Sequence, residues 1–148
     1  MIIPEACFNF QVPKDLASGL LQIILRSTDT NSVAATSIEA DAITVPADRV
    51  LVLTAASLSA RAGAGQNVSN MQIQILAVDS GEDFNLAVDR EAGAAAGAKD
   101  LRWVGQVWVP PEATVQGVAQ FNAGVVANTL DNFSICGISI PRGNVQQG

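Results

Sequence analysis

Few side chains in this sequence could carry out catalysis. The 148-residue chain contains no histidine, so Ser-His-Asp and Cys-His nucleophilic sites are excluded in their usual forms. Zinc and iron centres with histidine ligands are excluded for the same reason. The two cysteines, Cys7 and Cys136, are too few for a thiolate zinc site. We therefore predict that the chain is not an enzyme, and that it has no catalytic residue, no metal site and no cofactor.

One cluster of acidic residues has the chemistry to bind a cation. Asp79, Glu82 and Asp83 surround Gly81, and carboxylates on a turn can hold calcium. Their spacing does not match the twelve-residue calcium loop, and we interpret the segment as a solvated turn between strands. A carboxylate pair for glycoside hydrolysis stays open, because the spacing of such a pair is set in three dimensions. Only two tryptophans are available as aromatic platforms for a sugar.

The two cysteines could form one disulfide if the fold made them adjacent. Residues 1–5 lack the basic region and the long apolar stretch of a signal peptide. We therefore expect synthesis in a cytoplasm, where thiols stay reduced. Cys136 lies in an apolar stretch, and we predict that it is a packed free thiol.

The charge of the chain argues against nucleic acids and membranes as partners. The net charge is -6 and the pI is about 4.3, whereas a protein that binds nucleic acid needs a basic face to neutralise phosphates. The eight Lys and Arg residues are scattered singly along the chain. No apolar run is long enough for a membrane span.

Two stretches with the same pattern indicate how the chain is organised. Residues 42–53 and 107–118 each contain a strand-like run, then Val-Pro with an acidic residue close behind, then a second run. Proline cannot donate to a sheet ladder, so it lies where a strand ends or at a sheet edge. Each stretch is therefore predicted to form two strands that are joined by a tight connection.

Most of the remaining chain alternates between apolar and polar residues, as half-buried strands do. Residues 49–53 are apolar on both faces, which is typical of a central strand covered on both sides. The predicted strands lie near 20–26, 33–38, 49–60, 70–78, 84–89, 101–109 and 132–140, with further strands from the Val-Pro stretches near 42–45 and 115–121. The expected fold is all-β, a single-domain β-sandwich or jelly roll of about eight or nine short antiparallel strands.

The domain is expected to span residues 1–148, with an N-terminal arm at 1–18 and a flexible tail at 144–148. Its apolar fraction is 49%, but aromatic residues make up only 5% and tyrosine is absent. A core built from Ala, Val, Ile and Leu buries modest area per side chain, and such cores often gain stability from oligomerisation. We predict a homo-oligomer, with a trimer favoured.

The sequence resembles the small jelly-roll structural proteins of tailed bacteriophages. The resemblance lies in residues 44–53, 107–112, 118–122 and 137–143. It implies a virion protein, most plausibly a capsid decoration or cement protein that binds the outer capsid surface and stabilises the shell. The implied partner is the major capsid protein or a neighbouring virion protein, and the implied location is the virion after synthesis in the host bacterial cytoplasm.

Two places on the chain are candidates for the contact with that partner. The N-terminal residues Met1, Ile2, Ile3 and Pro4 are apolar for a free terminus, although they could equally pack on their own sheet. Trp108 shares its strand face with polar residues and is expected at a rim or a subunit contact. Two alternatives remain: a receptor- or glycan-binding appendage module, which aromatic residues along a groove would favour, and a cellular β protein or enzyme.

Overall fold

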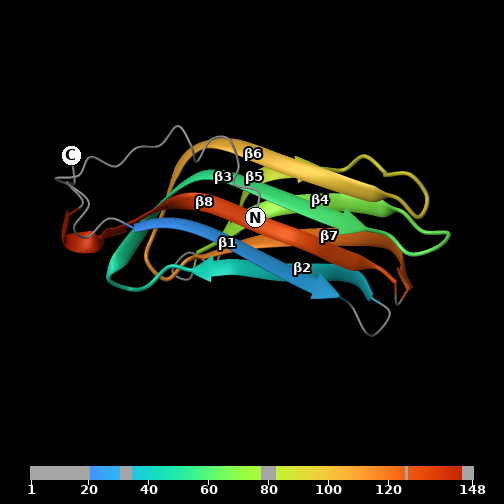
Figure 1. Cartoon of the computed structure of the whole chain (residues 1–148), viewed down its shortest axis with the longest axis horizontal. Helices are drawn as coiled ribbons and strands as arrows, with labels where there is room; N and C mark the ends of the chain where they lie inside the picture. Colours follow the sequence, from blue (N-terminus) through green and yellow to red (C-terminus); the bar gives the residue numbers. More distant parts are fainter. Residues whose placement is uncertain (1–20, 31–34, 78–82, 126, 145–148) are drawn as a thin grey trace.

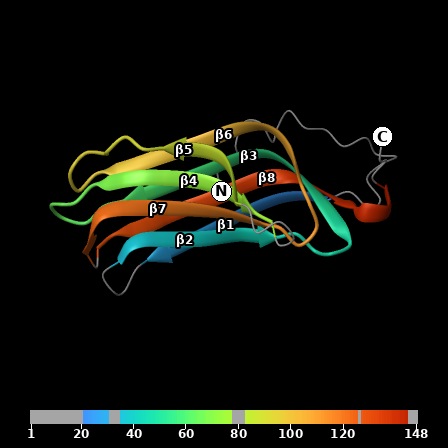
Figure 2. The same ribbon diagram turned by 180° about the vertical axis from the view of Figure 1, so that it is seen from behind.

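The chain folds into two four-stranded antiparallel sheets that pack face to face (Figure 1, Figure 2). This fold is a computed structural model that describes residues 21–30, 35–77, 83–125 and 127–144. One sheet has the strand order β1-β8-β3-β6 and the other β2-β7-β4-β5. The strands are β1 (Leu21–Thr30), β2 (Ala35–Thr44), β3 (Arg49–Arg61), β4 (Val68–Leu76), β5 (Asp83–Asp89), β6 (Ala98–Val109), β7 (Thr114–Val125) and β8 (Thr129–Pro141). The all-β sandwich that the sequence predicts is therefore confirmed.

Two predicted boundaries differ from the structure. The strand predicted near 20–26 is longer than expected, because the polar residues 27–30 continue β1. The runs near 33–38 and 42–45 were expected as separate strands, but they form the single strand β2. Both β1 and β2 are edge strands, and each pairs along its length with a neighbour, β8 and β7 respectively. Backbone hydrogen bonds from that neighbour hold the strand in place whatever the polarity of its side chains.

The two Val-Pro stretches are corners at which the chain passes from one sheet to the other. β2 and β3 lie in different sheets, as do β6 and β7. The corners also bind each other: the Val45 N–H donates to the Ala113 carbonyl (2.9 Å), and the Glu112 N–H donates to the Val45 carbonyl (2.7 Å). The hydroxyls of Thr44 and Thr114 lie 2.8 Å apart beside them. The repeated sequence pattern thus becomes a paired corner that ties the two sheets together.

The sandwich buries residues on both faces of its central strand β3. Leu51 and Leu53 point into the core between the sheets. Val50 and Val52 point to the opposite side and are also buried, so the prediction of a strand covered on both faces is confirmed. Beside them on β8, Cys136 is buried as well, outside the core cluster.

The prediction of a free thiol at Cys136 is wrong. Cys136 is disulfide-bonded, and the only other cysteine in the sequence is Cys7, which lies outside the described residues. Whether two distant cysteines pair depends on the distance that the fold leaves between them. The apolar sequence around Cys136 and the supposed redox compartment therefore led to the wrong prediction.

The two predicted chain ends are described only in part. The N-terminal arm, 1–18, and the last residues, 145–148, lie outside the described residues. The 3-10 helix η2 (Arg142–Asn144) follows β8 and contains the first residue of the predicted tail. Among the described residues, no helix has the length and hydrophobicity that a bilayer crossing requires.

Candidate functional site

The edge formed by β5 and β6 is the most unusual surface of the described chain. β5 ends one sheet and β6 ends the other, and both lie along the same side of the sandwich (Figure 1, Figure 2). We call this surface, Asp83–Asp89 with Ala98–Val109, the β5–β6 edge. Along β6 only Val109 is buried. A strand of twelve residues is thus available along its outer side for contact with another molecule.

All of the large apolar side chains that are exposed in the described residues lie on this edge. Phe84 is 61% exposed and Val88 38% on β5, while Val104 is 72% exposed and Trp108 51% on β6. Single exposed apolar residues are ordinary on a protein surface, but a contiguous set often marks an interaction site. Phe84 and Trp108 line one pocket, whereas Val104 points outward from its own sheet and Val88 points outward from the other sheet. The gathering of these side chains on two neighbouring edge strands is the main functional signal among the described residues.

The alternation of β6 separates its two tryptophans, as the sequence predicts. Trp103 packs against the core together with Leu101 and Val107, whereas Trp108 points outward. The Trp103 ring lies over Gly105, where a Cβ atom would come within 2.8 Å of the ring. Glycine at 105 thus makes room for the indole, which secures β6 to the sandwich and leaves Trp108 free to face a partner.

A pocket of about 300 Å³ opens at the end of the edge where β6 stops. Phe84 and Trp108 contribute aromatic rings, and Asp83 is the one ionisable side chain among the described residues that line it. These described residues are Ile75, Ala77, Asp83, Phe84, Val107, Trp108 and Pro110. Its volume is at the lower end of the range for small-molecule sites, about 300–1,000 Å³. A mostly apolar lining with one carboxylate suits an apolar side chain or the face of a sugar ring.

The other end of the edge is held by an ion pair. Lys99 of β6 lies 3.0 Å from the Asp89 carboxylate of β5 and also donates to the Glu91 carbonyl. The Glu91 N–H and then Lys99 lower the pKa of Asp89 below its ordinary value. Because the pKa of Asp89 is lower in the folded protein than in the unfolded chain, the ionised carboxylate stabilises the fold at pH values above the unfolded pKa. This stabilisation is lost as the pH falls through the folded pKa. The ion pair is therefore intact at neutral pH.

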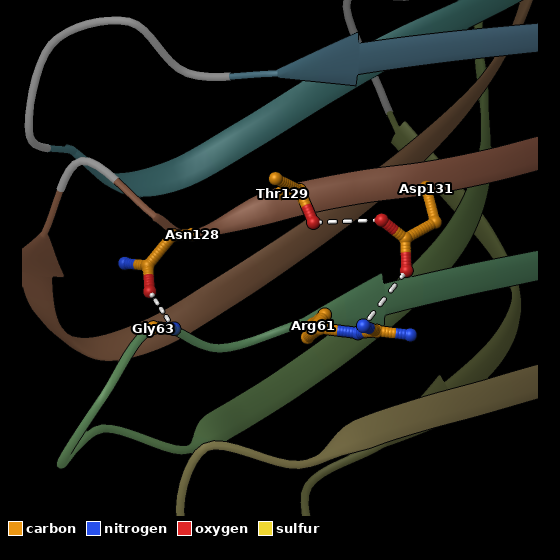
Figure 3. A network of polar contacts seen from close by, with 5 residues as sticks. All are labelled: Arg61, Gly63, Asn128, Thr129 and Asp131. Carbon is orange, nitrogen blue, oxygen red and sulfur yellow. Dashed lines mark hydrogen bonds and ion pairs between the residues drawn. The ribbon is translucent and has the colours of Figure 1, made fainter.

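A second group of polar residues is structural in character. Asn128 is fully buried; its Oδ1 accepts from the Gly63 N–H (2.8 Å), and its Nδ2 donates to the Ala123 carbonyl (3.0 Å). The amide thereby links the turn before β4 to the turn between β7 and β8 (Figure 3). Nearby, Arg61 and Asp131 form an exposed ion pair at 3.8 Å. This group holds two loops together and presents no reactive centre.

Replacing Asn128 with alanine should lower the free energy of unfolding by about 2 kcal/mol, because buried backbone groups would lose their partners. Urea denaturation measures the change. The matched control is Asp131→Ala, which removes the exposed ion pair and the exposed hydrogen bond from the Thr129 hydroxyl and should cost less than about 0.5 kcal/mol. Equal effects of the two substitutions would contradict the structural role of Asn128.

Of the residues predicted to contact a partner, the structure describes Trp108 and not the N-terminal four. Met1, Ile2, Ile3 and Pro4 lie outside the described residues. Trp108 is exposed and lines the pocket. Sequence reasoning missed the other three exposed apolar residues of the β5–β6 edge, Phe84, Val88 and Val104. The alternation of apolar and polar residues does not reveal which strand lies at the end of a sheet. In the part of the chain that the structure describes, no group of three or more acidic or cysteine residues is placed to hold a metal ion.

Comparison with known proteins adds little beyond the sandwich fold. No protein-family model and no curated protein matches the sequence. Among solved structures, a protein of infectious bursal disease virus strain Gx is similar at 12% identity and a TM-score of 0.38, over 84% of this chain and 33% of that one. A xylan-binding domain of family CBM 22 is similar at 14% identity and a TM-score of 0.34, over 90% of this chain and 93% of that one. The chain thus spans about a third of the viral protein.

Proposed function

We propose that the chain is a non-catalytic structural protein of a tailed-bacteriophage virion, which decorates the outer capsid surface and stabilises the shell. The observation that carries the proposal is the β5–β6 edge, with its four exposed apolar side chains on two neighbouring strands. Such a surface suits a protein whose task is to bury area against neighbouring subunits. The lack of histidine in the sequence agrees with a role without turnover.

The physical mechanism is mass action. A subunit that binds the assembled shell and not its dissociated parts stabilises the shell, by about 2.7 kcal/mol per site when its free concentration is 100 times Kd. A specific contact of this kind buries at least about 1,000 Å² in total. Trp108 is the expected anchor, because tryptophan dominates the binding energy of many interfaces and because it borders an open pocket.

The test uses particles of the phage that encodes this sequence. The protein should be present in purified particles, and particles without it should release their DNA at a lower temperature. Trp108→Glu should weaken rebinding to stripped particles at least tenfold, about 1.4 kcal/mol. The control Thr36→Glu adds the same charge at an exposed position on β2, at the opposite edge, and should rebind normally. Absence of the protein from particles, or an unchanged release temperature, would refute the proposal.

One observation favours a second candidate, a glycan-binding appendage module. The pocket combines the rings of Phe84 and Trp108 with the carboxylate of Asp83, and aromatic faces with a polar group can hold a sugar ring. Affinity electrophoresis in gels that contain soluble bacterial polysaccharides tests this function. Retardation that is lost in both Phe84→Ala and Trp108→Ala would favour it, whereas unretarded migration in every gel would exclude it for those polysaccharides.

A further inference from the structure

We propose that the β5–β6 edge binds a second copy of this chain, with β6 of one copy antiparallel to β6 of the other around a twofold axis. The inference rests on the proposed function, because it names one neighbour against which the edge is buried. The two sheets that contain β1-β8-β3-β6 would then join at β6 and continue from one protomer into the next.

The second half of β6, residues 103–109, has no charged side chain that would protect its free side against pairing. Natural edge strands are usually short, or contain charges, proline or bulges that prevent another strand from adding. β6 has twelve residues, and residues 103–109 contain neither a charged residue nor a proline. Its one irregularity toward β3 lies between Val104 and Val107, opposite Thr54. This bulge and the charges of Lys99, Asp100 and Arg102 limit pairing over part of β6, and the uncharged residues 103–109 are the part that we infer to pair.

The extent of the edge fits a small dimer interface. β5 supplies 7 residues and β6 supplies 12, but several of them face the core, so the contact is smaller than a standard interface with 20–30 residues on each side. Val104 lies in the middle of β6 and Trp108 near its end, whereas Val88 is the last residue but one of β5. A contact of this kind has an apolar centre, as stable interfaces do.

The charge of the edge also permits self-association. The two strands contain three acidic residues, Asp83, Asp89 and Asp100, and two basic residues, Lys99 and Arg102, which sum to -1. The whole chain has a net charge of -6, so most of its excess negative charge lies elsewhere. Two copies can therefore approach through this edge with less repulsion than the net charge suggests.

A twofold axis at Val104 gives an overlap from residue 99 to residue 109 of each strand, and it places an exposed apolar side chain at the axis. Val104 then faces the partner's Val104, and Arg102 faces the partner's Gln106. Arg102 is also diagonal to the partner's Trp108, within reach of a cation–π contact, because diagonal neighbours lie about 7–8 Å apart. These side chains all point outward from the sheet, on the same face as Trp108.

The experiment measures oligomeric state by light scattering during size-exclusion chromatography. The wild-type protein should elute with twice the 15.3 kDa of one chain, about 31 kDa. Val104→Lys places like charges opposite each other at the axis and should raise the dimer Kd at least tenfold. Thr36→Lys, the matched control at the opposite edge, should remain dimeric. Equal melting temperatures of the two variants at low concentration would show that both are folded.

A second variant tests the axis directly. Val104→Cys should form an intermolecular disulfide under mild oxidation, and Thr36→Cys should not. A wild-type monomer at about 100 μM, a trimer, or a dimer that Val104→Lys leaves intact would each overturn the inference. A protein that dimerises but is absent from particles would instead refute the proposed function, and a monomer that still binds particles would refute only the dimer.

Discussion

Replacing Phe133 with alanine should lower the free energy of unfolding by about 4 kcal/mol. Phe133 is among the fully buried side chains of β8 and belongs to the core between the sheets. It packs against β7 of the opposite sheet, where a Cβ added to Gly117 would lie 2.9 Å from the Cγ of Phe133 and 2.9 Å from Leu58. The ring therefore fills the space that Gly117 leaves, and its removal opens a cavity which a rigid sandwich can close only in part.

Urea denaturation, followed by circular dichroism, measures this effect. Phe84→Ala is the matched control, since it is the same chemical change at a side chain that is 61% exposed. It should change stability by less than about 0.5 kcal/mol. A small effect at Phe133 would mean that the two sheets do not meet at this ring.

Replacing Trp103 with alanine should destabilise the fold by about 3 kcal/mol, at the lower end for tryptophan because the side chain is only partly buried. Trp108→Ala removes an exposed ring from the same strand and should change the stability of the monomer by less than about 0.5 kcal/mol. Denaturation at low protein concentration separates these effects from association.

Fluorescence gives an independent measurement of the same difference. Trp108→Phe leaves Trp103 as the only indole, and its emission should lie at shorter wavelength than that of the Trp103→Phe protein, because Trp103 packs against the core. If Trp108→Ala destabilised the monomer more than Trp103→Ala, the assignment of the two strand faces would be wrong.

Much of the local structure was predictable because it depends on neighbouring residues. The period-two alternation of β6 separates Trp103 from Trp108, and the structure places Trp103 against the core and Trp108 at the surface. The Val-Pro pattern located two short connections, since proline ends a ladder. Polar edge residues were the exception: residues 27–30 look like a loop, yet they pair with β8.

The candidate site was predictable only in part. Trp108 was identified because its strand face is otherwise polar, and the structure finds it exposed beside a pocket. Phe84 and Val104 could not be identified as its neighbours, because β5 and β6 belong to different sheets and no sequence period connects them. The state of Cys136 was also predicted wrongly, because disulfide bonding depends on a distance across the fold.

The sequence by itself determined that this protein is an all-β sandwich, which face of several strands is apolar, and where the corners lie. These features follow from interactions between residues that are close along the chain, namely alternation, β propensity and the missing N–H of proline. Only the tertiary structure decided that the two Val-Pro corners bind each other, that Cys136 is bonded, and that β5 and β6 end their sheets side by side. Strand order is set by pairing between distant segments, and this pairing decides which apolar residues are left at an edge for a partner.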